Sequence, residues 1–286
     1  MFGTPKPKKS EVGIDFKSEL NSDQFQAVTA PFGPALVLAG AGSGKTRTLT
    51  YRVAYLLSQG VSPEKILLLT FTNKASKQML GRVEELTGVS SHRFLGGTFH
   101  HVGGQVLRLF GDCIGLPRNF TILDDADSDA LLSEVIRELD PGFFKSKENP
   151  KAKPIKAIIS FSRNVMLPVE DVARGRYPSN SELLAKIDSF MRDYQDTKIR
   201  RGLADYDDLL GLWLQVLETN KDAARYYQER FSHILVDEYQ DVNSLQSKIV
   251  DKIAANHQIM AVGDDAQCIY TWRGADIDQI LGFPER

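Results

Sequence analysis

Residues 35–50 place a short apolar run directly before a glycine-rich loop, and this pairing constrains the fold more than any other feature of the chain. Residues 35–38 have the pattern of a buried parallel strand, and residues 48–57 that of a helix after the loop. Glycines in such a loop let successive backbone N–H groups converge on one anion, because a Cβ would block the approach. The stretch predicts a phosphate-binding loop in an α/β protein. The alternative is a glycine-rich turn before an ordinary helix.

The loop and the first helical turn carry the groups expected to hold a nucleotide. The helix dipole adds partial positive charge there. Lys45 is expected to reach the β- and γ-phosphates, and the Thr46 hydroxyl to ligate Mg²⁺. Ala39 departs from the strict signature, which has glycine at that position. The residues predicted to bind the nucleotide here are Ala39, Gly40, Ala41, Gly42, Ser43, Gly44, Lys45, Thr46 and Arg47.

Composition is ordinary for a globular protein: the 286 residues are 42% hydrophobic and 25% charged, enough for one large domain or two. The only cysteines, Cys113 and Cys268, lie far apart and suggest neither a disulfide framework nor a zinc site, which fits a reducing, cytoplasmic compartment. No apolar run approaches the length of a membrane span, and the N-terminus lacks a signal-peptide core. The net charge of −2 does not decide about nucleic acid, because a local basic track suffices to bind it.

The N-terminal region divides into a tail and a short helix. Residues 1–16 are rich in proline and lysine and are expected to be disordered. Asn21 or Ser22 is expected to cap a helix shortly before the phosphate loop. Within it, Gln24 has an amide that can pair with an adenine edge. A surface helix residue is the alternative for Gln24.

Two further segments are expected to meet the same edge of the sheet. Residues 65–70 read as a second buried strand, and ligands of open α/β sheets bind at carboxyl strand ends. Phe71 is therefore either a core aromatic or a platform that stacks a base. Residues 97–101 are interpreted as a polar loop at a strand end. The adjacent histidines lack a cysteine or carboxylate at metal-ligand spacing.

Residues 106–204 change in character, because helical periodicity dominates, most clearly over 131–139 and 182–196. We interpret them as an α-helical insertion that interrupts the α/β frame. Its basic stretch, residues 143–156, either meets a phosphate backbone or is a solvated loop broken by proline. After the insertion, the acidic residues of 205–208 open another helix, where N-capping is a simpler explanation than catalysis.

An apolar strand over 233–236 ends in Asp237 and Glu238, the Walker B arrangement. Asp237 is expected to hold Mg²⁺ through its water shell, and Glu238 to orient and deprotonate the attacking water. The alternative is a pair of acids that merely terminates a strand. The nucleotide interpretation requires Lys45 and this pair to lie on adjacent strand ends, facing a shared triphosphate.

Residues 259–262 form the last predicted strand, and the segment after it is chemically rich. Gln267 lies at the strand tip, where it could sense the γ-phosphate. Tyr270, Trp272 and Arg273 supply two π-faces and a cation, which suits base stacking and contact with a backbone. Packing against a partner domain is the alternative for these three side chains.

In order along the chain, these segments resemble the N-terminal motor half of UvrD/Rep-type superfamily 1 DNA helicases. The resemblance covers residues 20–275, and Ala39 itself is typical of this family's loop. Ala266 and Cys268 depart from the usual form of the last motif. The matching segments are the Q motif (20–28), motif I (39–46), motif Ia (70–75), motif Ib (97–100), the Asp-Tyr-Asp-Asp-Leu-Leu stretch (205–210), motif II (236–241) and motif III (262–275).

The resemblance implies a RecA-like P-loop domain, 1A (17–105 and 205–286), interrupted by a helical subdomain, 1B (106–204). It also implies ATP and Mg²⁺ as cofactors, 3′→5′ translocation on single-stranded DNA, and contact with a duplex junction through 1B. The implied catalytic residues are Lys45, Asp237, Glu238 and Gln267, with Gln24 at adenine and Thr46 and Asp237 at the metal. The implied DNA-binding residues are Phe71, Asn73, Thr98, His100, Tyr270, Trp272 and Arg273.

Helicases of this family hydrolyse ATP between two motor domains, and the second domain and its arginine finger would follow residue 286. That arginine is worth on the order of 10³–10⁵ in rate. The 286 residues are therefore expected to bind nucleotide weakly and to turn over little or none. The competing hypothesis is a standalone ATP- or DNA-binding module that acts through partners. An unrelated P-loop ATPase would leave the tyrosine–tryptophan–arginine segment and the helical insertion unexplained.

Overall fold

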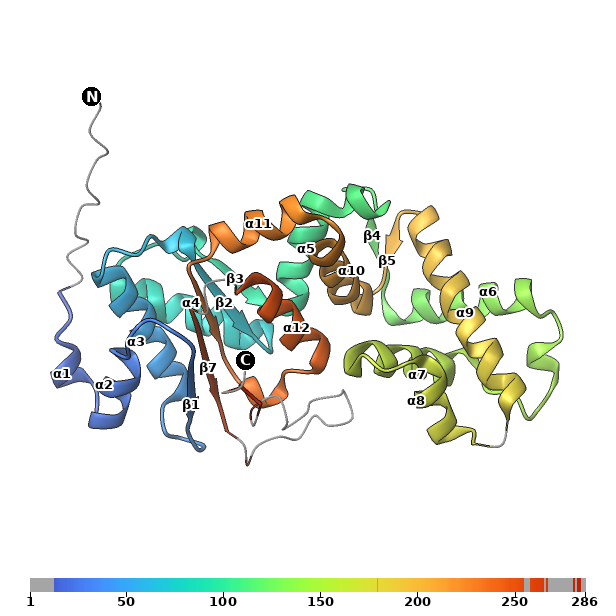
Figure 1. Cartoon of the computed structure of the whole chain (residues 1–286), viewed down its shortest axis with the longest axis horizontal. Coiled ribbons are helices and arrows are strands. Elements are labelled where there is room, and N and C mark those ends of the chain that lie inside the picture. Colours follow the sequence, from blue (N-terminus) through green and yellow to red (C-terminus); the bar gives the residue numbers. More distant parts are fainter. Residues whose placement is uncertain are drawn as a thin grey trace, which may run out of the picture.

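The computed structural model describes residues 13–178, 180–254, 258–264, 266, 280, 282 and 283. It contains a sheet covered by helices and, beside it, a second body made of helices (Figure 1). Most of the predicted tail, residues 1–12, lies outside the described residues. Its last residue, Phe16, opens a short helix that Asp15 caps.

Strands and helices alternate along the first half of the sheet-containing body, as the fold class requires. The strands are β1 (Ala35–Leu38), β2 (Ile66–Thr70), β3 (Leu95–Thr98), β4 (Thr121–Ile122), β5 (Leu203–Ala204), β6 (His233–Val236) and β7 (Ile259–Gly263). The helices are α1 (Phe16–Glu19), α2 (Ser22–Val28), α3 (Lys45–Ser58), α4 (Asn73–Thr87), α5 (Phe99–Phe110), α6 (Asp125–Leu139), α7 (Ala152–Val165), α8 (Val169–Arg176), α9 (Ser181–Arg200), α10 (Tyr206–Thr219), α11 (Lys221–Arg230) and α12 (Ser244–Ile253). Short 3₁₀ turns used below are η4 (Phe143–Lys145) and η5 (Tyr239–Asp241).

The main sheet has five parallel strands in the order β1-β7-β6-β2-β3. Its register pairs Ala35 with Met260 and Leu67 with both Leu95 and Ile234. Because all strands run the same way, their carboxyl ends share one edge, where ligands of such sheets bind. The predicted α/β class with a parallel sheet is confirmed.

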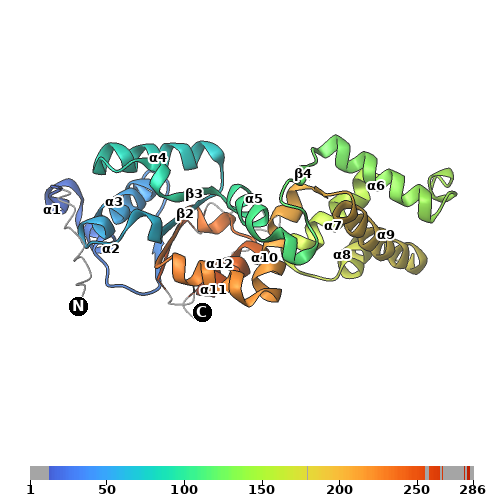
Figure 2. The same ribbon diagram turned by 90° about the horizontal axis from the view of Figure 1, so that it is seen from above.

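Side chains alternate between the two faces of the sheet and bury it on both sides. Ile66 and Leu68 join the cluster beneath α3 and α4, whereas Leu67 and Leu69 join the cluster formed with α5, α10 and α12. Viewed from above, α4 and α12 lie on opposite sides of the strands (Figure 2). The strands are therefore continuous apolar runs, which explains why the sequence shows them without alternation.

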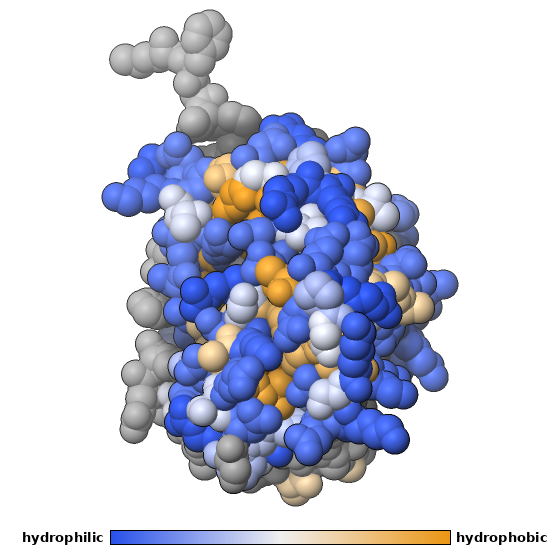
Figure 3. All heavy atoms as spheres, turned by 90° about the vertical axis from the view of Figure 1, so that its right-hand side faces the viewer, coloured by the Kyte–Doolittle hydropathy of each residue, from blue (hydrophilic) through white to orange (hydrophobic). Residues whose placement is uncertain are grey.

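The second body consists of α6, α7, α8 and α9, which pack around their own apolar core. Its end face is mostly hydrophilic, with apolar side chains between the charged ones (Figure 3). The chain enters this body through β4 and leaves it through β5, and these two strands pair in parallel. The predicted helical insertion is present. Across the part of the chain that the structure describes, no helix is both long and apolar enough to cross a membrane.

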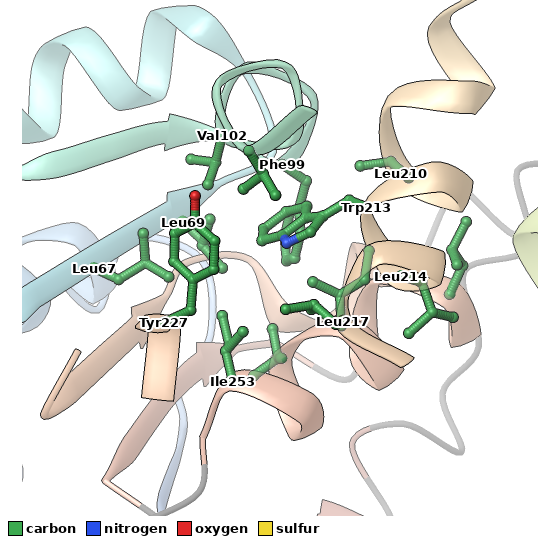
Figure 4. Close-up of a cluster of buried hydrophobic side chains, with 14 of the residues drawn as sticks. Leu67, Leu69, Phe99, Val102, Leu210, Trp213, Leu214, Leu217, Tyr227 and Ile253 are labelled. Carbon is green, nitrogen blue, oxygen red and sulfur yellow. The ribbon is translucent and has the colours of Figure 1, made fainter. Parts of the chain in front are cut away.

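Helix α5 belongs to the sheet-containing body, although the expected boundary at residue 106 falls within it. Phe99 and Val102 pack with Trp213 of α10 in the largest apolar cluster (Figure 4). Gly103 allows this approach, since a Cβ there would collide with the carbonyl group of Leu209. We propose that the helical subdomain begins at β4.

One local prediction was wrong because a helix begins earlier than the sequence suggested. Thr98 accepts a hydrogen bond from the N–H of His101 and caps α5, so the predicted polar loop over 97–101 is the end of a strand and the first turn of a helix. For the basic stretch 143–156 the sequence left a backbone-binding surface and a solvated loop open, and the structure has η4 and the start of α7 in part of it.

Candidate functional site

The phosphate loop connects β1 to α3 and takes the backbone conformation that only glycine adopts readily. Gly42 has φ 76° and Gly44 has φ 91°, both in the left-handed region. A Cβ at Gly44 would lie 2.7 Å from Nε2 of Gln24, so this glycine also makes room for α2. The Ser43 hydroxyl donates to the carbonyl oxygen of Gly40 at 2.7 Å and closes the turn.

Lys45, the first residue of α3, is buried between the loop and two carboxylates. Its Nζ donates to the carbonyl oxygen of Ala39 at 3.3 Å. The same atom lies 3.8 Å from Oε2 of Glu238 and 3.6 Å from Oδ2 of Asp264. The expected convergence of Lys45 with the acids after β6 is therefore observed. The expectation of adjacent strands was wrong, because β7 lies between β1 and β6 and pairs with both.

Asp237 and Glu238 follow β6 directly and differ in environment. Asp237 is buried, and burial raises its pKa to about 6, with the charge of Glu238 adding to the effect. Glu238 is one-third exposed and has φ 50° and ψ 52°, a left-handed conformation rare outside glycine and asparagine. Such conformations cluster at functional sites, where the surrounding structure maintains them.

Sequence reasoning missed two residues that hold this acidic end of β6 in place. Nε2 of Gln240 donates to Oε2 of Glu238 at 2.7 Å. Oε1 of Gln240 accepts a hydrogen bond from the N–H of Asp264 at 2.9 Å. Asp264 could have been found, because it follows a buried strand just as Asp237 does. Gln240 carries no comparable signal in the sequence.

The donors predicted for a metal, Thr46 and Asp237, are both hard oxygen ligands and suit Mg²⁺. Mg²⁺ is commonly held by one or two carboxylates together with water and phosphate oxygens. Across the described ranges, no group of three or more histidine, cysteine, aspartate or glutamate residues could hold a metal by itself. Two protein oxygens leave the other positions of an octahedral ion to water and phosphate oxygens, so these residues fit Mg²⁺ bound together with a nucleotide.

Gln24 and Arg47 lie near the loop, and both contact protein groups. Nε2 of Gln24 donates to the carbonyl oxygen of Ser43 at 2.9 Å, which places α2 against the phosphate loop. Arg47 donates to the carbonyl oxygen of Glu19 at 2.8 Å, and its guanidinium lies 4.6 Å above the Tyr51 ring. If Gln24 bound adenine, its side-chain amide would form hydrogen bonds with the base in place of part of its present contact with the loop.

A cleft of about 1170 Å³ separates the carboxyl edge of β2 and β3 from the helical subdomain; we call it the interdomain cleft. Four residues predicted to contact DNA line it: Phe71 and Asn73 after β2, and Thr98 and His100 after β3. On the same surface, the exposed Tyr206 lies with its ring 5.2 Å from that of His100. Helix α7 supplies Lys156, Ser160 and Asn164 from the opposite wall.

Comparison with known proteins decides what this arrangement belongs to. The family model described as the UvrD/REP helicase N-terminal domain matches residues 20–286. The chain belongs to the UvrD/REP helicase family. The ATP-dependent DNA helicase PcrA of Staphylococcus epidermidis strain RP62A is 40% identical over 269 residues, covering 93% of this chain and 36% of that protein. PcrA of Staphylococcus aureus strain Mu50 is 38% identical over 268 residues, with the same two coverages. The chain thus spans about a third of the length of these relatives.

Several residues that the UvrD/REP resemblance assigns to coupling and DNA binding lie outside the described residues. These are Gln267, Tyr270, Trp272 and Arg273. All four follow Asp264 in the sequence. Their roles stay predictions.

In this UvrD/REP domain, one short segment joins the acidic pair to the interdomain cleft. Asp241, at the end of η5, lines the cleft, and burial together with the charge of Glu238 raises its pKa to about 6. Two residues later, Asn243 caps α12, and its Nδ2 donates to Oδ1 of Asn164 on α7 at 3.0 Å. Glu238 is therefore joined through five residues of chain to the cleft wall, and through one side-chain hydrogen bond to the helical subdomain.

A buried charge cluster joins the helical subdomain of this UvrD/REP chain to α10. The Asp205 side chain caps α10 together with Asp208, as N-capping predicted. Lys198, fully buried, places Nζ 2.5 Å from Oδ2 of Asp205 and 2.6 Å from Oδ2 of Asp208. Arg163 of α7 adds a contact to Asp208 at 3.0 Å. Although burial opposes ionisation, these cations hold the pKa of Asp205 well below its usual value.

Replacing Asp237 with asparagine is expected to stabilise the protein in the absence of metal. The pKa of Asp237 is raised from 3.8 to about 6, so the folded state binds this proton more tightly than the unfolded chain. Stability therefore falls as pH rises from about 4 to about 6 and stays low above it. At pH 8 in EDTA, Asp237→Asn should raise the free energy of unfolding by about 3 kcal/mol, and near pH 4 by almost nothing.

Urea denaturation at the two pH values measures this difference. The matched control is Glu148→Gln, an exposed carboxylate of the helical subdomain, which should change stability by less than about 0.5 kcal/mol. A gain that is equal at both pH values would show that ionisation of Asp237 is not the cause.

Proposed function

We propose that this chain is the ATP- and single-stranded-DNA-binding motor half of a helicase that moves 3′→5′ along DNA. The observation that carries the proposal is the charge cluster of Lys45, Glu238 and Asp264, which brings the phosphate loop and the end of β6 to one point. A strand-terminal carboxylate beside a loop lysine is the arrangement that nucleotide hydrolysis requires. The relatives named above are ATP-dependent DNA helicases, which supports the same assignment.

In this proposal the triphosphate takes the position of the carboxylates as the partner of Lys45. The amides of the phosphate loop and the dipole of α3 bind the phosphates, and Lys45 reaches the β- and γ-phosphates. Thr46 and Asp237 would hold Mg²⁺, which supplies charge neutralisation at the phosphate oxygens. Glu238, held by Gln240, is then free of Lys45 and orients the attacking water as general base.

Single-stranded DNA would lie in the interdomain cleft. Phe71 and the His100–Tyr206 ring pair offer π-faces to unstacked bases, and such stacking tolerates any sequence. The segment after β7, with Gln267 and the predicted DNA-binding residues Tyr270, Trp272 and Arg273, would complete the path. We also propose that the helical subdomain meets the duplex junction.

Turnover is proposed to need a second motor domain that supplies an arginine to the transition state. Removing such an arginine costs on the order of 10³–10⁵ in rate. The 286-residue chain should therefore bind ATP while its steady-state hydrolysis stays near background, even with single-stranded DNA present.

The test is a pair of titrations with the chain itself. A fluorescent ATP analogue with Mg²⁺ and a fluorescein-labelled oligo-dT should both bind, and the analogue should be displaced by unlabelled ATP. DNA affinity should fall steeply with salt, because phosphate contacts release counterions. Absence of saturable analogue binding would reject the nucleotide site, whereas robust DNA-stimulated turnover would show that no second domain is needed.

A further inference from the structure

Arg52 is a buried cation of α3 whose partners lie in the segment before the phosphate loop. It is only 3% exposed, and burial lowers its pKa. Its Nη1 donates to two carbonyl oxygens, those of Val28 at 2.8 Å and Ala30 at 2.7 Å. Its guanidinium also lies 6.0 Å from the Phe32 ring and 5.6 Å from the Tyr55 ring.

These contacts place Arg52 at the C-terminal end of α2. Val28 is the last residue of that helix, where carbonyl groups lack intrahelical partners and the dipole is negative. A buried guanidinium satisfies the carbonyls and balances that partial charge. Arg52 thus attaches α2, and the connection from it to β1, to the helix that carries Lys45.

The other end of α2 is attached to the phosphate loop. Gln24 donates through Nε2 to the carbonyl oxygen of Ser43, and Asn21 closes a capping box with Gln24. Helix α2 is therefore held at both ends by one rigid unit, the loop and α3. Two carbonyl contacts at one end and one amide contact at the other fix the position of Gln24 relative to the phosphate loop.

We infer that Arg52 is a positioning residue for the nucleobase: by fixing α2, it sets where Gln24 meets adenine and so determines the preference for ATP over GTP. The inference rests on the proposed function, in which Gln24 recognises adenine. Arg52 touches no nucleotide in this scheme. Its effect is confined to the base, because Lys45 and the loop are positioned by β1 and α3.

The test compares three ligands on the 286-residue chain: ATP, GTP and inorganic tripolyphosphate, each measured by displacement of a fluorescent ATP analogue. Arg52→Met should weaken the binding of ATP about tenfold, as expected for losing one contact with the base. It should weaken the binding of GTP and of tripolyphosphate less than about twofold. Gln24→Ala should weaken ATP binding by the same factor. The variant that combines Arg52→Met with Gln24→Ala should bind ATP no more weakly than either single variant.

Arg52→Lys keeps the charge and an ammonium donor but loses the planar guanidinium, so it should retain more of the ATP preference and weaken ATP binding only about threefold. This variant carries the test if Arg52→Met does not fold. Equal weakening of all three ligands would mean that Arg52 only stabilises the fold and would overturn the inference, as would an unchanged ATP-to-GTP ratio. A wild-type chain that binds ATP and GTP equally would reject adenine recognition itself, and a wild-type chain that binds none would reject the nucleotide site.

Discussion

Lys45→Ala is expected to weaken binding of ATP and its analogues at least about 100-fold, a loss of roughly 3 kcal/mol. Lys45 is the cation that balances Glu238 and Asp264, with its Nζ 3.8 and 3.6 Å from their carboxylates. Without it, two carboxylates would face a polyanionic triphosphate in a partly buried site, where like charges are poorly screened. The loss thus combines a missing attraction with an added repulsion.

Fluorescence titration with an ATP analogue, at several Mg²⁺ concentrations, measures this effect. Lys186→Ala is the matched control, because Lys186 is a more exposed lysine that pairs with Glu182 and Asp140 in the helical subdomain. The circular dichroism of the Lys45 variant should match the wild type, because the loop glycines and the strands do not depend on this side chain. An affinity within about threefold of wild type would remove Lys45 from the phosphate site.

Lys198→Met is expected to lower the free energy of unfolding by about 3–5 kcal/mol, the largest stability effect that we expect from a single charge. Lys198 is fully buried, contacts Asp205 and Asp208, and lies 4.1 Å above the Tyr194 ring. Its removal leaves two buried carboxylates with Arg163 as their nearest remaining cation. An uncompensated buried charge costs far more than a lost surface pair.

Urea denaturation followed by circular dichroism provides the measurement, and Lys186→Met is the control, expected to cost less than about 1 kcal/mol. Because α10 begins at this cluster and Tyr206 lines the interdomain cleft, oligo-dT affinity should fall together with stability. A loss below about 1 kcal/mol would mean that water or a rearranged partner solvates the two carboxylates.

The sequence predicted well the elements whose signals are local. It placed within a few residues the strands around the phosphate loop and motif II, and the helix that Asp205 caps. It also gave Asn21 or Ser22 as the cap of α2, and Asn21 is the one observed. Each depends on an apolar run or a capping residue read within about ten positions. The start of α5 was missed although Thr98 carries a capping signal, because the following histidines were interpreted as a loop.

Features that depend on contacts between distant elements were not predicted. The order of the strands, with β7 between β1 and β6, is a property of pairing across the whole chain. Arg52 and Lys198 read as ordinary surface cations of helices until packing buries them. Gln240 likewise gains its contacts with Glu238 and Asp264 from the way that η5 folds over β7.

The strand order also has a consequence for how the protein is made. During synthesis β1 emerges early, but its neighbour in the sheet is β7, which pairs Met260 with Ala35. Until β7 leaves the ribosome, β1 has no partner, and only β2 and β3 of the early strands can pair with each other. Such high contact order slows folding and leaves apolar edges open to aggregation. The helical insertion, with its own core, can fold in the interval, so the nucleotide site should assemble after it.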